Sequence, residues 1–110
     1  MPLLRSIPST RIINGHEVKT SETLLISEPS YVTNGEYAIV VKGVKYCELT
    51  LNSKTTDHVV VKALTTVLIK PDKNRIDEEY DEVELNKGAC VEFFFMGGNW
   101  YILSSDGLKF

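Results

Sequence analysis

Hydrophobic and polar residues alternate along most of this chain with the two-residue period of β-strands. In residues 46–51 the odd-numbered positions are apolar, whereas the even-numbered ones hold Tyr, Glu and Thr. No stretch of eleven or more residues has the apolar spacing of an amphipathic helix. Val, Ile and Thr make up 28 of the 110 residues and Ala only three, which favours pleated strands over helices. The chain is therefore predicted to be all-β.

Turn signals divide this pattern into short strands. Asn34-Gly35 is typical of a two-residue hairpin, Gly97-Gly98 of a primed turn, and residues 86–88 and 105–107 of further turns. Short strands with turns every 8–12 residues indicate a compact antiparallel β-sandwich or barrel-like domain, expected over residues 21–110. The expected strands are 23–27, 31–33, 36–42, 46–51, 58–64, 65–70, 83–85, 89–96 and 99–104.

The first twenty residues differ from this domain. Pro2 and Pro8 remove ladder donors and favour extended backbone, so residues 1–20 are predicted to form an extended N-terminal arm that includes a turn at Asn14-Gly15. One interpretation is a frayed terminus. The other, favoured here, is an arm that docks on a partner, because a free tail would expose its large aliphatic residues: Leu3, Leu4, Ile7, Ile12 and Ile13.

The segment 89–104 is predicted to be a hairpin that is apolar on both faces. Its first strand carries three consecutive phenylalanines, and Trp100 follows the tight turn directly. A two-layer β domain has only one interior, so the second face is expected to need cover from another subunit. The candidates for a subunit interface or for the core are Phe93, Phe94, Phe95, Trp100 and Tyr101.

Charge and composition narrow the class of function. The net charge of -3 disfavours a nucleic-acid partner, which requires a dense basic face. No apolar run is long enough for a membrane helix, and the N-terminus lacks the apolar region of a secretory signal. No catalytic, phosphate-binding or zinc-binding signature occurs, so neither an enzyme nor a cofactor is expected.

Cys47 and Cys90 are expected to be buried free thiols, with a disulfide between neighbouring strands as the alternative.

Residues 77–84 contain six of the fifteen acidic residues. The favoured interpretation is a solvated loop that discourages edge-to-edge strand pairing. A cation site is an alternative, although the order of residues does not match a calcium-binding loop. Another alternative is an electrostatic contact with a basic partner, made by Asp77, Glu78, Glu79, Asp81 and Glu82.

The C-terminal third resembles a known class of protein. The sequence Gly98-Asn99-Trp100-Tyr101-Ile102-Leu103, preceded by the apolar strand 91–95, resembles the closing hairpin of small β modules in tailed-bacteriophage virion proteins. Such modules occur in tail fibres, head fibres and capsid decoration proteins. Residues 46–51, 55–61 and 68–72 are similar to their strand–turn–strand units, so the resemblance spans roughly residues 36–107, while the acidic run matches no part of it.

The resemblance implies a virion structural protein, usually a homotrimer, without catalysis or cofactor. Because the chain lacks the long repetitive segments of a tail fibre, a capsid decoration (cement) protein that binds the major capsid protein is favoured. A neck, collar or tail component is the alternative. The tyrosines and Trp100 also suggest a receptor- or sugar-binding module, although Trp100 is favoured as a core or interface anchor.

Overall fold

A computed structural model describes residues 9–13 and 16–109, with side chains for residues 22–106. Every regular element in these ranges is a β-strand, so the all-β prediction is confirmed. The strands are β1 (Ser9–Ile13), β2 (His16–Ser21), β3 (Thr23–Ile26), β4 (Ser30–Val32), β5 (Ala38–Val41), β6 (Tyr46–Leu51), β7 (His58–Ala63), β8 (Thr66–Pro71), β9 (Val83–Met96) and β10 (Asn99–Lys109).

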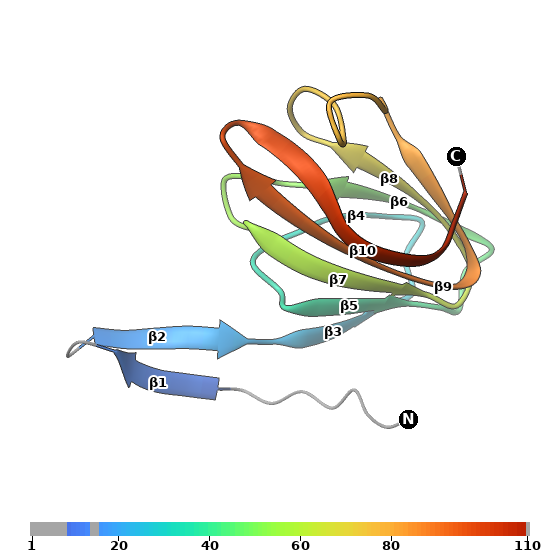
Figure 1. Cartoon of the computed structure of the whole chain (residues 1–110). Helices are drawn as coiled ribbons and strands as arrows, with labels where there is room; N and C mark the ends of the chain where they lie inside the picture. The colour runs from blue at the N-terminus through green and yellow to red at the C-terminus, as the bar shows by residue number, and fades with distance from the viewer. Residues whose placement is uncertain (1–8, 14–15, 110) are drawn as a thin grey trace.

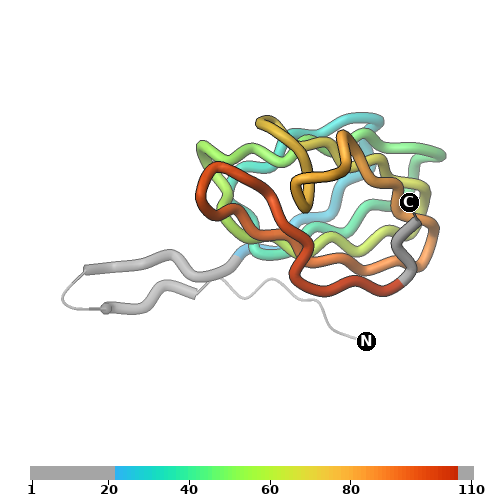
Figure 2. The backbone as a smooth tube through the Cα atoms, turned by 45° about the horizontal axis from the view of Figure 1, so that its top comes forward, coloured from blue at the N-terminus to red at the C-terminus, as the bar shows by residue number. Residues whose placement is uncertain are grey.

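The chain winds through two layers of parallel strands (Figure 1). Strands β3, β5 and β7 form one layer, and β4, β6 and β8 form the other. Each strand from β3 to β7 therefore pairs with the strand two places further along the chain. Three coils result, β3–β4, β5–β6 and β7–β8, and the tube in Figure 2 follows the chain from layer to layer. This stacking of coils is the arrangement of a short β-solenoid.

The long hairpin β9–β10 closes one end of the stack. Residues 90–94 of β9 pair with β7, and residues 83–85 pair with β8, in both cases antiparallel. One strand thus joins the two layers into a single eight-stranded sheet that curls into a nearly closed, barrel-like form. The barrel-like prediction is confirmed in this respect.

The core lies between the layers, where inward residues of successive strands stand in rows. One row contains Ile39, Val61 and Val91, which pair across β5, β7 and β9. Leu49, Ile69 and Val83 make the matching row across β6, β8 and β9. All six side chains are at most 2% exposed. The alternation of apolar and polar residues in the sequence therefore corresponds to the inward and outward faces of each layer.

The predicted antiparallel arrangement is wrong for the three coils, as is the hairpin at Asn34-Gly35. These two residues form a corner between the layers, because β4 pairs with β6 and β5 pairs with β3. Gly35 has φ 87°, and its N–H donates to the Thr56 hydroxyl of the next corner at 2.8 Å. A Cβ there would approach the Thr55 carbonyl oxygen to 3.1 Å. The glycine thus lets successive corners stack closely.

The turns expected at 86–88 and 105–107 are also wrong. Both segments lie inside continuous strands, β9 and β10. The pairing steps from Cys90–Asp106 to Leu85–Leu108, so residues 86–89 of β9 lie opposite the single residue 107 of β10 and form a bulge. A bulge bends the strand without ending it, and it occurs here where β9 passes from one layer to the other.

At the opposite end of the stack, the outer edges of β3 and β4 pair with no other strand among the described residues, and this end is called the open end below. Glu22 and Ile26 accept hydrogen bonds from β5, so the backbone groups of Thr23 and Leu25 turn to the free edge. On β4 the same alternation turns Ser30 and Val32 outward, because Pro29 and Thr33 bond to β6. The Leu25 and Val32 side chains are 55% and 53% exposed. The open end is a template for strand pairing.

The N-terminal region contains a second, two-stranded sheet. Strands β1 and β2 pair antiparallel, with Ile12 opposite Glu17 and Ile13 opposite His16. The arm residues Leu3, Leu4 and Ile7 lie outside the described residues. The proposed docking role of all five aliphatic residues therefore stays a prediction.

Candidate functional site

Four ring side chains cross the outer face of the β5–β7–β9–β10 layer and are called the aromatic row. They are Tyr37, just before β5, His58 on β7, Phe94 on β9 and Tyr101 on β10. His58 lies opposite Phe94 in the strand register, and Phe94 lies opposite Tyr101. Ring centroids are 6.1 Å apart for Tyr37 and His58, and 5.5 Å for Phe94 and Tyr101. Because outward positions of adjacent strands align, these two ring pairs lie next to each other in the strand register, although their residues are distant in sequence.

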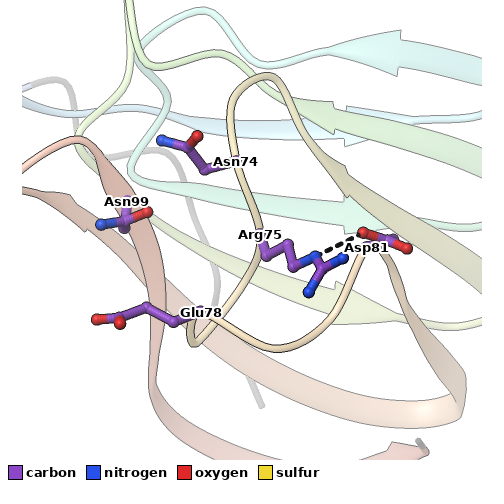
Figure 3. A pocket seen from close by; sticks show the side chains of 5 residues that line it. All are labelled: Asn74, Arg75, Glu78, Asp81 and Asn99. Carbon is purple, nitrogen blue, oxygen red and sulfur yellow. Dashed lines mark hydrogen bonds and ion pairs between the residues drawn. The ribbon is translucent and has the colours of Figure 1, made fainter.

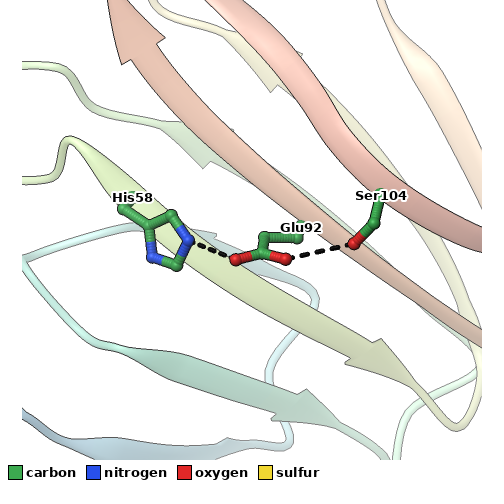
Figure 4. Close-up of polar contacts among 3 residues, drawn as sticks. All are labelled: His58, Glu92 and Ser104. Carbon is green, nitrogen blue, oxygen red and sulfur yellow. Dashed lines mark hydrogen bonds and ion pairs between the residues drawn. The ribbon is translucent and has the colours of Figure 1, made fainter.

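A carboxylate is fixed beside this row (Figure 4). Glu92 hydrogen-bonds the His58 ring through one oxygen, and the Ser104 hydroxyl donates to its other oxygen at 3.1 Å. The side chains of His58 and Glu92 are 34% and 27% exposed, so both remain open to solvent. The contacts set the direction of the carboxylate and leave acceptor capacity for a ligand.

A polar pocket lies at the β10 end of the row (Figure 3). Its volume is about 460 Å³, and it is lined by Asn74, Arg75, Glu78, Asp81 and Asn99. Arg75 bonds Asp81 at 3.1 Å, and the Asn74 amide donates to the Gly98 carbonyl at 2.7 Å. The Tyr101 hydroxyl donates to Glu78 at 2.8 Å, which links the aromatic row to the pocket wall.

The loop between β8 and β9 holds the pocket residues against the hairpin. Ile76 is fully buried, and the Asp77 carboxylate accepts from the Ile102 N–H at 2.9 Å. Asn74, Asp77 and Glu78 have φ between 55° and 59°, a left-handed conformation that is uncommon for residues other than glycine. These contacts maintain the unusual backbone, which places Glu78 beside Tyr101.

The acidic run therefore docks on its own chain. Asp77 and Glu78 bond to β10, and Asp81 pairs with Arg75. Glu79 and Glu82 are exposed. The electrostatic contact with a basic partner stays a prediction. Within the described residues, no group of three or more His, Cys, Asp or Glu side chains is arranged to hold a metal ion.

The aromatic candidates divide between the core and the outer face. Phe93 and Trp100 are fully buried in the core, and Phe95 packs on Trp100 with ring centroids 5.2 Å apart. Phe94 and Tyr101 face outward as part of the aromatic row. The sequence pattern pointed to the tyrosines only as a group, and it did not indicate His58 or Glu92 for this face. The signal that the sequence offered for these residues was their place at the outward positions of the apolar–polar alternation along each strand.

Asp72 anchors the buried Trp100 from the loop side. The indole N–H donates to Asp72 at 3.0 Å, and the Ser53 N–H and hydroxyl both donate to the other carboxylate oxygen at 2.8 Å. Burial raises the pKa of the Asp72 carboxyl, but these hydrogen bonds outweigh it and hold the pKa below its ordinary value of 3.8.

The lowered pKa of Asp72 predicts an acid-dependent loss of stability. The contribution is fully present above pH 3.8, the ordinary value, and is lost as the pH falls through the lower pKa of the folded state. Urea unfolding at pH 7 and pH 3 should show an Asp72-dependent difference below about 1 kcal/mol, because the carboxyl is partly in solvent. The Asp72→Asn variant keeps an acceptor for Trp100 and should lose that difference; an equal pH dependence in both proteins contradicts the prediction.

A second hollow, of about 280 Å³, lies near the open end and is lined by Glu22, Thr23, Leu24, Asn34 and Glu36. Glu36 is only 4% exposed and accepts from the Tyr31 hydroxyl and from the Asn34 N–H. Burial, followed by the bond to Glu36, raises the pKa of the Tyr31 phenol above its usual range. With both oxygens bonded, Glu36 stabilises the loop before β5.

Both cysteines are free thiols. Cys47 is buried, and Cys90 on β9 is partly exposed. Burial raises the pKa of the Cys47 thiol, which favours the neutral, unreactive form.

Within the described part of the chain, no helix has the length and apolar character to cross a membrane.

Comparison with known proteins leaves the site to be interpreted from its geometry: no family model matches this sequence, and no curated protein matches it.

Proposed function

We propose that this protein is a non-enzymatic structural protein of a tailed-bacteriophage particle, and specifically a capsid decoration protein. In this role it binds the major capsid protein of the assembled head and stabilises the shell. Its copies act as homotrimers. The observation that carries the proposal is the open end, where two edge strands from opposite layers are available for pairing with a neighbouring chain.

The sequence of the hairpin supports the choice of a virion protein. Residues 91–103, which resemble the closing hairpin of phage β modules, form the end of β9, its tight turn and the start of β10. A closing hairpin is required in such a module because the end coil of a stack otherwise exposes its edges. The position of this hairpin at the end of the stack supports the proposal.

The open end supports a docking role. A neighbouring strand can pair with the outward backbone groups of Leu25 and Val32, while the exposed side chains of these residues add apolar contact. Each such contact is short, so a single copy binds weakly. Three linked copies on a repeating shell gain strength by multivalency, and this is what a clamp between capsomers requires.

A charged residue at the open end should prevent incorporation into particles. Leu25→Lys places a cation on the free edge of β3, where it disfavours strand pairing. Purified particles of the phage that encodes this chain should contain many copies of the wild-type protein by quantitative mass spectrometry. We expect Leu25→Lys to reduce that copy number at least about tenfold, which corresponds to about 1.4 kcal/mol of binding free energy.

Leu103→Lys is the matched control. Leu103 is 57% exposed, close to the 55% of Leu25, but it lies on β10 at the other end of the stack. This variant should be incorporated like the wild type. Absence of the wild-type protein from purified particles overturns the virion proposal, whereas normal incorporation of Leu25→Lys rejects the open end as the docking surface.

A further inference from the structure

We propose that the aromatic row and the adjoining polar pocket bind a neutral oligosaccharide. The site is independent of the open end, because it lies on the outer face of one layer and at the β9–β10 hairpin. It adds a ligand to the structural role and does not depend on that role.

The row has the length and shape of an extended ligand. Its rings stand on β7, β9 and β10 and on the residue just before β5, so with strands about 4.8 Å apart the row is about 15 Å long. The rings are tilted by 35° within the Tyr37–His58 pair and by 30° within the Phe94–Tyr101 pair, which gives two shallow aromatic surfaces that lie in line across the layer. The apolar C–H faces of pyranose rings carry partial positive charge and stack on the negative faces of aromatic rings. Several linked sugars can therefore contact Tyr37, Phe94 and Tyr101 in succession.

The polar groups beside the row match sugar hydroxyls. Glu92 and Glu78 carry carboxylates that accept hydrogen bonds, and both are oriented by contacts within the chain. Asn74, Arg75 and Asn99 add donors inside the pocket. A hydroxyl both donates and accepts, so one sugar satisfies both kinds of group. The pocket volume of about 460 Å³ accommodates the terminal sugar of a chain that lies along the row.

Charge and hydrogen bonding favour a sugar over other ligands that stack on aromatic rings. Nucleic acid stacks its bases on such rings, but its phosphates would approach Glu92, Glu78 and Asp81. A proline-rich peptide lacks N–H groups and offers carbonyl acceptors, which carboxylates cannot bond. The same carboxylates disfavour acidic sugars. A neutral oligosaccharide stacks on the rings, donates hydrogen bonds to the carboxylates and carries no negative charge that they would repel.

The test measures binding of defined hexasaccharides by titration calorimetry and by chemical-shift changes. Cellohexaose, maltohexaose and chitohexaose are the neutral probes, and hexagalacturonate is the acidic counterpart. We expect at least one neutral probe to bind with a dissociation constant in or below the millimolar range, and hexagalacturonate to bind at least about tenfold more weakly. Tyr37→Ala should weaken neutral binding at least about tenfold, which corresponds to the loss of one stacked ring.

Tyr46→Ala is the matched control, because Tyr46 is 45% exposed, like Tyr37 at 48%, but lies on the opposite layer. It should bind as the wild type does. A second variant, Tyr101→Phe, keeps the ring and removes the bond to Glu78, and should weaken binding less than Tyr37→Ala. The proposal is overturned if no neutral probe binds, or if Tyr46→Ala and Tyr37→Ala have equal effects. Self-association that Tyr37→Ala abolishes also overturns it, because the row is then a protein interface.

Discussion

Trp100→Ala should destabilise the protein by about 3–5 kcal/mol, the usual cost of truncating a large buried aromatic residue. Trp100 is the only tryptophan in the chain, and its side chain is fully buried. It packs against Phe95, and its backbone C=O accepts from the Asp77 N–H at 2.9 Å. Removing the indole leaves a cavity under the acidic loop and removes the donor to Asp72. A natural domain has only about 5–15 kcal/mol of stability to lose.

The measurement is urea unfolding followed by far-ultraviolet circular dichroism, since the variant lacks the fluorescent side chain. The loss corresponds to a fall in Tm of roughly 12–20 °C, at about 4 °C for each kcal/mol. Tyr101→Ala is the control, because the next residue on β10 faces outward and should cost about 1 kcal/mol or less. A Trp100→Ala variant within about 1 kcal/mol of wild type would show that the loop does not depend on this anchor.

Leu49→Ala should cost about 2–5 kcal/mol. Leu49 lies in β6, in the middle coil, and is fully buried. Its register partners are Tyr31 on one side and Ile69 on the other, so truncation removes contacts to both neighbouring coils. Because a stacked coil is stabilised only by its neighbours, this position affects the whole stack.

Leu25→Ala provides a control of the same residue type. Leu25 is 55% exposed on the edge strand β3, so its truncation should change the free energy of unfolding by less than about 0.5 kcal/mol. Both variants are compared with wild type by urea unfolding at one pH. Equal losses in the two variants would mean that the middle coil is not the stabilising centre of the sheet.

Local pattern predicted the strands well because alternation reports which face of a strand is buried. The predicted segment 46–51 coincides with β6, and its apolar positions point into the core. Pairing was harder to predict, because a corner and a hairpin use the same residues. Gly35 supplies a positive φ in either case, and the pairing of β4 with β6 and of β5 with β3 distinguishes the corner from a hairpin.

The spacing of the paired strands along the sequence also indicates stacked coils. Tyr46 pairs with Thr66, twenty positions later, and this separation is typical of stacked coils. The aromatic row could not be predicted without the pairing. Tyr37, His58 and Phe94 are far apart in the sequence and become neighbours only when β5, β7 and β9 align. By contrast, the position of Trp100 after the tight turn predicted a core or interface anchor, and the structure places its side chain in the core.

The double pairing of β9 determines when the fold can be completed. Until residues 83–96 leave the ribosome, both β7 and β8 lack their partner on β9, and each is an additional open edge beside those of β3 and β4. Pairing between residues distant in sequence is slow, because the chain must first lose loop entropy. During synthesis this protein therefore passes through a prolonged state that is prone to aggregation, and the last third of the chain ends that state by closing both layers at once.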